Sequence, residues 1–226
     1  YTVAWLDCTA KGKNLGRGHF TRGNHIGGNE LEASSSLRLN VPLTPPMSLV
    51  NSMSVPIFNT LYFHKQLQHS KSTVSHYDPY FYPLDGILNW NRIYGPKGFL
   101  QYQCVIPLNQ SHVTITEILR IISNSGIGSF LVVIKVCGDI KSPGMMSFPI
   151  AGTSLALDFP NIEGKTLPLF DILDKIVAET GGRIYPAKDA HMSAKNFQKF
   201  YSNWRDFEKF KDPNFSSNFW RRVTES

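Results

Sequence analysis

Two glutamines in the segment Phe99–Ile106 are the first residues whose type and spacing could bind a polar ligand. The alternation of the segment predicts a strand, with Gln101 and Gln103 on one face and apolar residues on the opposite, core-facing side. Two amides in register form a row of hydrogen-bond donors and acceptors that could orient a ligand. A solvated sheet face is an equally good interpretation of this strand taken alone.

Two lysines could place an ammonium group beside a ligand. Lys135 interrupts the apolar run Phe130–Cys137, where a lysine is costly unless it faces a wet pocket. There it could act as a base or bind phosphate or hydroxyl oxygen, although it could also simply reach water at a strand end. Lys188 follows Tyr185 and Pro186, and the proline would fix the turn that positions the lysine just past a strand. A surface lysine in a polar turn is the alternative.

Composition limits the class of protein. A chain of 226 residues with 42% hydrophobic and 12% aromatic residues is typical of a globular protein with one core, or one domain plus a docking segment. No apolar run is long enough to span a membrane, and no signal-peptide pattern opens the sequence.

The charged residues and cysteines give weaker indications. The net charge of +6 suggests attraction to an anionic partner, such as a phosphate-bearing substrate or an anionic membrane surface, or is ordinary solubilising charge. Three cysteines without Cys-x-x-Cys spacing, together with scattered histidines, argue against a disulfide framework and a zinc site. We therefore predict no metal, and a cytoplasmic or membrane-peripheral location.

The order of predicted elements indicates an α+β fold. Two recurring units of a strand, a helix and a strand form a β-α-β-β-α-β pattern, the ferredoxin-like unit. This unit packs both helices on one face of an antiparallel sheet and leaves the other face free. The predicted elements are strands at 1–7 and 15–22 joined as a hairpin, a mobile loop or lid at 24–54, a helix at 58–69, a strand at 75–82, and then the ferredoxin-like unit with strand 99–106, helix 112–125, strands 129–137 and 153–160, helix 166–180 and strand 183–186.

Several ordered motifs resemble the substrate domain of flavin-dependent sugar oxidases of the vanillyl-alcohol-oxidase superfamily. The resemblance is spread from Tyr1 to about Asp189 and weakens between 31 and 73. The motifs are Tyr82-Pro-Leu-Asp85, Trp90-Asn-Arg92, Gly98-Phe-Leu-Gln-Tyr-Gln103, Ser147-Phe-Pro149, Leu157-Asp-Phe-Pro160 and Gly181-Gly-Arg-Ile-Tyr-Pro-Ala-Lys-Asp189.

The resemblance implies an FAD cofactor, bound mainly by a flavin domain that precedes this region. Residues 1–186 would form the substrate-binding (cap) domain, and the aromatic-rich segment 187–226 would dock on the flavin domain. Because the chain begins inside a predicted strand without an initiator Met, we expect a carboxy-terminal fragment that alone neither holds FAD tightly nor turns over.

The resemblance also implies roles for single residues. Lys188, which matches the active-site lysine of the family, would be catalytic and would lie with Tyr185 beside the flavin, whereas Lys135 is a second catalytic candidate on the pattern of its own strand. The substrate-binding residues would be Gln101, Gln103, Cys137, Ser154, Ala156 and Tyr185.

Three of these positions depart from the family pattern. Ala156 stands where relatives carry a cysteine, Ser154 where an asparagine is common, and Cys137 where an aromatic residue is expected. The pocket should therefore lack the reactive thiol and differ in shape.

The function implied is oxidation of a hydroxyl of a sugar, or of a polyprenyl-phosphate-linked sugar, with hydride passing to the flavin and a short-chain reductase as a further partner. The alternative is a stand-alone ferredoxin-like binding module for an anionic ligand such as single-stranded nucleic acid. Such a sheet should expose paired aromatic residues, whereas Gln101, Gln103 and Lys135 occupy the central strands here. We therefore expect no nucleic-acid partner.

Overall fold

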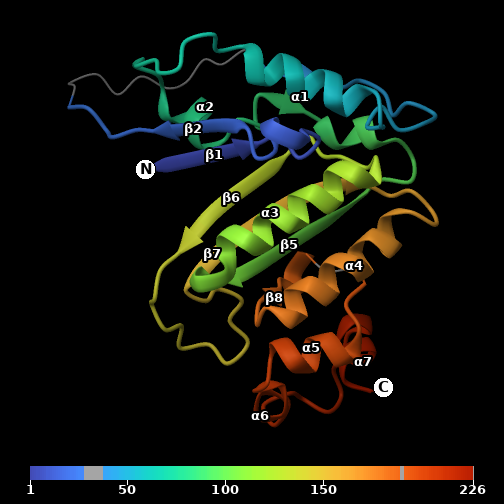
Figure 1. Ribbon diagram of the computed structural model, residues 1–226. Coiled ribbons are helices and arrows are strands. Elements are labelled where there is room, and N and C mark those ends of the chain that lie inside the picture. Colours follow the sequence, from blue (N-terminus) through green and yellow to red (C-terminus); the bar gives the residue numbers. More distant parts are fainter. Residues whose placement is uncertain (28–37, 189–190, 226) are drawn as a thin grey trace.

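The computed structural model describes residues 1–27, 38–188 and 191–225, and its centre is a six-stranded sheet in the order β2-β1-β6-β7-β5-β8 (Figure 1). The neighbouring strands of this sheet are antiparallel. Its strands are β1 (Thr2–Leu6), β2 (Gly18–Arg22), β5 (Phe99–Pro107), β6 (Val132–Cys137), β7 (Gly152–Pro160) and β8 (Arg183–Ile184), and two short parallel strands, β3 (Leu39–Asn40) and β4 (Ile87–Leu88), pair separately.

Helices occupy the connections of the sheet and the carboxy-terminal end of the chain. Three short 3-10 helices are η1 (Gly12–Asn14), η2 (Trp90–Tyr94) and η3 (Pro186–Lys188). The α-helices are α1 (Ser54–His64), α2 (Tyr77–Phe81), α3 (Leu108–Ser125), α4 (Thr166–Glu179), α5 (Ala194–Phe200), α6 (Trp204–Glu208) and α7 (Asn218–Thr224). Within the described ranges, none of these helices has both the length and the apolar character required to cross a bilayer.

The predicted α+β fold and its ferredoxin-like order are confirmed. The elements of this unit follow one another along the chain as β5, α3, β6, β7, α4 and β8. Its strands lie side by side in the order β6-β7-β5-β8. The hairpin of β1 and β2 extends this sheet beyond β6, where the registered pair is Trp5 with Val133.

The core lies between one face of the sheet and helices α3 and α4 (Figure 1). On β5, Tyr102, Cys104 and Ile106 are buried in this core, as the alternation predicts. The helices contribute residues at helical spacing, including Ile118 on α3 and Leu173 on α4, both fully buried. We call the opposite side of the sheet the open face.

The open face is not wholly free, which corrects the prediction. Helix α1 covers one end of it: Phe58 contacts Phe130, with 4.8 Å between ring centroids, and Tyr62 contacts Trp5 at 4.7 Å. A second small core forms there around Val50, Val55 and Tyr94, with Trp90, Ile93, Phe99 and Phe130 packed against it. Large apolar side chains on this side require cover, because leaving them in water forfeits the free energy of burial.

The prediction of a strand at 75–82 is wrong. Residues Tyr77–Phe81 form helix α2, because His76 caps its first turn: its ring Nδ1 accepts a hydrogen bond from the backbone N–H of Asp78 at 3.2 Å. Several boundaries also shift, two of them at the beginnings of elements near the amino terminus. Helix α1 begins at Ser54 rather than 58, and β2 begins at Gly18 because η1 and the turn after it use the preceding residues.

The carboxy-terminal aromatic segment has a partner surface within this chain. Phe197, Phe200, Tyr201 and Trp220 are buried in the main core, and the Tyr201 hydroxyl donates to the Ile184 carbonyl at 2.7 Å. These residues therefore pack within this chain. Docking on another domain stays a prediction for the aromatic residues that are exposed here: Phe207, Phe210 and Phe215. The predicted mobility of the loop at 24–54 stays untested, and its residues 28–37 lie outside the described ranges.

Candidate functional site

The register of β5, β6 and β7 brings the predicted binding residues onto adjacent positions of the open face. Gln103 pairs with Ala156, and Lys135 pairs with Ser154. The Gln103 amide donates to the Ser154 hydroxyl at 3.3 Å. Directly paired residues of antiparallel strands point to the same side of a sheet, so these side chains form one polar surface.

Tyr185 and Lys188 join this surface from the far edge of β5. The backbone N–H of Tyr185 donates to the Gln103 carbonyl at 2.9 Å, and the N–H of Lys188 donates to the Tyr185 carbonyl at 3.1 Å. This short turn, η3, holds Lys188 beside the strand that carries both glutamines. The ring of Tyr185 stacks on Phe148 with 4.7 Å between centroids, a contact that the sequence did not indicate.

Lys135 and Cys137 lie on the other side of β7. Cys137 is half-buried and pairs with Gly152 at the end of the sheet, two residues beyond Lys135. Lys135 is exposed. A role as a base would require the ammonium group of Lys135 to be shielded from water, and it is not. Lys135 is instead an accessible cation that could bind an anionic group.

Asp158 is a site residue that the sequence reasoning missed. It pairs with Gln101 on the open face and is 3% exposed, and its Oδ1 has no hydrogen-bond partner in the described part of the chain. Burial raises the pKa of Asp158, while the Gln101 amide and the positive charge of Lys188 act in the opposite direction. A carboxyl group two residues after Ala156 in a largely apolar and buried strand was the signal that could have identified it.

Tyr94 is the second missed residue. It is buried at the end of the open face against Phe99, with 4.7 Å between ring centroids. Its hydroxyl, like Oδ1 of Asp158, has no partner among the described residues, and burial together with the charge of Asp158 raises its pKa. Two buried polar atoms near each other without partners leave hydrogen-bonding capacity unused at this end of the site.

Arg183 adds a further positive charge to the face. It pairs with Val105, so it lies in the same row as Ser154 and Lys135. Its Nη1 donates to the Ser147 carbonyl at 2.9 Å, while its buried Nε has no partner in the described ranges. The face therefore combines amides and a hydroxyl at its centre with cations at both sides, an arrangement that suits a ligand with hydroxyl and phosphate groups.

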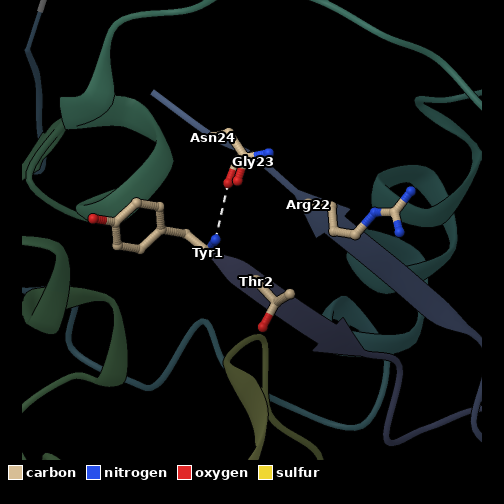
Figure 2. A pocket seen from close by; sticks show the side chains of 5 residues that line it. All are labelled: Tyr1, Thr2, Arg22, Gly23 and Asn24. Atoms are coloured by element: carbon tan, nitrogen blue, oxygen red, sulfur yellow. Dashed lines mark hydrogen bonds between the residues drawn. The ribbon is translucent and has the colours of Figure 1, made fainter. Parts of the chain in front are cut away.

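Two cavities lie at the β1–β2 side of the molecule. Figure 2 shows one of about 550 Å³ at the open end of the hairpin, where the Tyr1 amino group donates to the Gly23 carbonyl at 2.9 Å. It contains none of the predicted site residues. The second, of about 730 Å³, lies between β1, β6 and the first turns of α3, and Lys135 is at its border.

No metal site is evident in the ranges that the structure describes, where three or more His, Cys, Asp or Glu side chains do not gather at one point. Cys8 and Cys104 are buried, and burial raises the pKa of each thiol to about 12. Both thiols are therefore uncharged at neutral pH and unsuited to nucleophilic attack.

Comparison with known proteins finds similarity to curated bacterial proteins. The chain is 32% identical, over 237 residues and 99% of its length, to decaprenylphosphoryl-beta-D-ribose oxidase of Mycolicibacterium smegmatis, of which the match covers 51%. It is also 29% identical over 132 residues to an uncharacterized protein in the mprA 5' region of Streptomyces coelicolor, covering 56% of this chain and 35% of that protein. No protein-family model matches. The chain thus spans about half the length, or less, of these curated relatives.

Proposed function

The chain belongs to the family of decaprenylphosphoryl-β-D-ribose oxidase, and we propose that it is the substrate-binding part of an FAD-dependent oxidoreductase that oxidises a hydroxyl group of a sugar. A polyprenyl-phosphate-linked sugar is the substrate class that we favour. The observation that carries the proposal is the single surface formed by Gln101, Gln103 and Ser154 between Lys135 on one side and Lys188 on the other.

The residues of the open face fit a flavin ring. The ring is flat and carries carbonyl and N–H groups at one edge, and the unpartnered Oδ1 of Asp158 leaves hydrogen-bonding capacity at this face. Tyr185 and Lys188 would hold the flavin from this chain. When bound, a flavin supplies the acceptor for the hydride that leaves the carbon bearing the hydroxyl group.

The side chains of this chain would act on the sugar itself. Gln101, Gln103 and Ser154 can donate to and accept from sugar hydroxyls, which orients the reacting carbon. Lys188 would stabilise the negative charge that develops on the hydroxyl oxygen as its proton leaves. Lys135 and Arg183 are suited to a substrate phosphate, and the short side chains of Ser154 and Ala156 leave room beside them.

The test is the variant Lys188→Ala in the longer, flavin-loaded protein that the proposal implies, with the flavin domain present. We expect the rate of flavin reduction by a polyprenyl-phosphoryl pentose to fall by about 10²–10³-fold, because a cation at the developing charge is lost. The rate is measured as anaerobic bleaching of the flavin absorbance. Thermal unfolding should be unchanged, because Lys188 is exposed.

A matched control is Lys195→Ala, which removes another exposed lysine from α5. In this variant the substrate should reduce the flavin at the wild-type rate. Near-normal reduction by Lys188→Ala would remove Lys188 from the reaction, and no reduction of the wild-type protein by any phosphoryl sugar would overturn the proposed substrate class.

A further inference from the structure

The connection between β6 and β7 reaches across the sheet. Its two ends lie together, because Cys137 pairs with Gly152. Its middle contacts β8, which is separated from β7 by β5: Arg183 of β8 donates from Nη1 to the Ser147 carbonyl at 2.9 Å. This connection, residues 138–151, is the long loop between β6 and β7 in Figure 1, and it is therefore fixed at the far edge of the sheet.

Phe148 is the one buried residue of this connection, all of which the structure describes. It is 6% exposed, yet within the described ranges it belongs to neither of the two hydrophobic clusters. Its ring stacks on Tyr185, with 4.7 Å between the ring centroids and 26° between the ring planes. The next residue, Pro149, restricts the backbone of Phe148 to extended conformations. Phe148 is therefore held on a stiff backbone and is buried against Tyr185, outside both cores.

The backbone of Tyr185 is fixed independently of Phe148. Its N–H donates to the Gln103 carbonyl at 2.9 Å, and its carbonyl accepts from the N–H of Lys188 at 3.1 Å. These bonds do not fix the angle of the Tyr185 ring, because the ring turns about side-chain torsions that backbone bonds leave free. A neighbouring ring restricts that angle, since aromatic pairs have preferred distances and orientations. The stack with Phe148 therefore decides how the Tyr185 ring is presented.

We propose that Phe148 is a positioning residue, which holds the Tyr185 ring at the angle at which that ring meets the flavin. The contact between Arg183 and Ser147 in turn holds Phe148 at the edge of the sheet. The inference rests on the proposed function, in which Tyr185 lies beside the flavin. Phe148 acts through Tyr185 and is not itself a catalytic residue.

The first measurement is made on the chain of 226 residues without flavin. In protein with isotope-labelled tyrosine, the variant Tyr185→Phe identifies the NMR signals of the Tyr185 ring. A stacked ring lies in the magnetic field of its neighbour's ring current, which displaces these signals. The variants Phe148→Leu and Phe148→Met remove that ring and should return the Tyr185 signals toward the values of free tyrosine. Phe148→Tyr keeps an aromatic ring and should leave them near the wild-type values.

The second measurement uses the longer, flavin-loaded protein. Phe148→Leu should alter the flavin absorbance spectrum before any substrate is added, because the ring beside the flavin changes its orientation. At saturating substrate the rate of flavin reduction should fall by about tenfold, with little change in KM, because a group near the reacting atoms is misplaced. Phe148→Tyr should restore the spectrum and the rate. A merely structural role would lower the amount of folded protein and leave both properties of the folded fraction unchanged.

The matched control is Phe219→Leu. Among the described residues, the Phe219 ring contacts Phe197 at 5.6 Å between centroids and packs against the main core, so the same chemical change falls on a different aromatic pair. It should leave the Tyr185 signals, the flavin spectrum and the rate as in the wild type. Unfolding curves show which variants remain folded.

Two outcomes would overturn the inference. One is that a folded Phe148→Leu protein has wild-type Tyr185 signals, or a wild-type spectrum and rate. The other is that neither Phe148→Leu nor Phe148→Met folds, because Phe148 would then serve the fold itself. If the wild-type protein oxidises no sugar, the proposed function fails instead, while the Tyr185 signals and the flavin spectrum still decide the role of Phe148.

Discussion

At the scale of single residues, two buried carboxylates have opposite surroundings. Asp7 accepts hydrogen bonds from Arg17 Nε at 2.9 Å and Nη2 at 2.7 Å, from Thr9 and from Asn59. Asp158 keeps an unpartnered oxygen in the site. A fully satisfied buried carboxylate joins elements together, whereas a partly satisfied one has capacity left for a ligand.

Asp7→Asn should lower the free energy of unfolding by about 3 kcal/mol, because it leaves the Arg17 guanidinium without its anion. Urea unfolding at neutral pH measures the change. The control Asp206→Asn removes the exposed ion pair with Lys209, at 2.7 Å, and should change stability by less than about 1 kcal/mol. Equal effects of the two variants would contradict a structural role for the buried pair.

The contribution of Asp7 to the free energy of unfolding should depend on pH. Burial raises the pKa of Asp7, but the hydrogen bonds from Thr9, Arg17 and Asn59 outweigh it and hold the pKa below its ordinary value of 3.8. The stabilisation is therefore fully present above about pH 3.8 and is lost as pH falls through the folded-state pKa. The difference in stability between the wild type and Asp7→Asn should shrink in this acidic range.

At the scale of elements, the pairing of β5 with β7 fixes the site. Nine residue pairs join these strands, from Phe99 with Pro160 to Pro107 with Gly152. A slip by one residue would turn Gln101 and Gln103 away from the open face, because side chains alternate along a strand. The close approach at Gly152 is one place where the sequence fixes this register.

Gly152→Ala should destabilise the protein by about 1–3 kcal/mol through overpacking. A Cβ at this position would lie 2.2 Å from the Ile106 carbonyl oxygen, so the two strands would have to separate locally. The control is Gly138→Ala, where a Cβ would meet nothing within 4 Å. Chemical unfolding of both variants measures the difference, and a Gly152→Ala protein as stable as Gly138→Ala would show that the strands separate at no cost.

At the scale of the whole molecule, the carboxy-terminal helices belong to the main core. Phe197 is fully buried and contacts Tyr201, Phe219 and Trp220, and Lys199 Nζ donates to the Ala178 carbonyl at the end of α4. Residues from α5 and α7 therefore share one hydrophobic cluster with the sheet. The ferredoxin-like unit and these helices should unfold together.

Phe197→Ala should lower the free energy of unfolding by about 3–5 kcal/mol, with one cooperative transition for the entire chain. Far-ultraviolet circular dichroism and tryptophan fluorescence, followed through the same denaturant series, should give coincident curves. The exposed Phe215, in the variant Phe215→Ala, should have little effect. Separate transitions for the two signals would mean that the helices form an independent unit.

The sequence by itself determined the ferredoxin-like elements, the core side of β5 and the group of polar residues on its other side. These follow from local periodicity, which depends on residues close together in the chain. It also indicated the family, through ordered motifs around Gln101, Gln103 and Lys188.

Only the tertiary structure decided which strands meet in which register, and so placed Asp158 opposite Gln101 and Arg183 opposite Val105. It also decided that α1 covers one end of the open face, and that Phe197 and Trp220 have partners in this chain. Contacts between residues far apart in sequence depend on the packing of complete elements. Local propensity therefore fixed the faces of β5, while long-range packing fixed what each face meets.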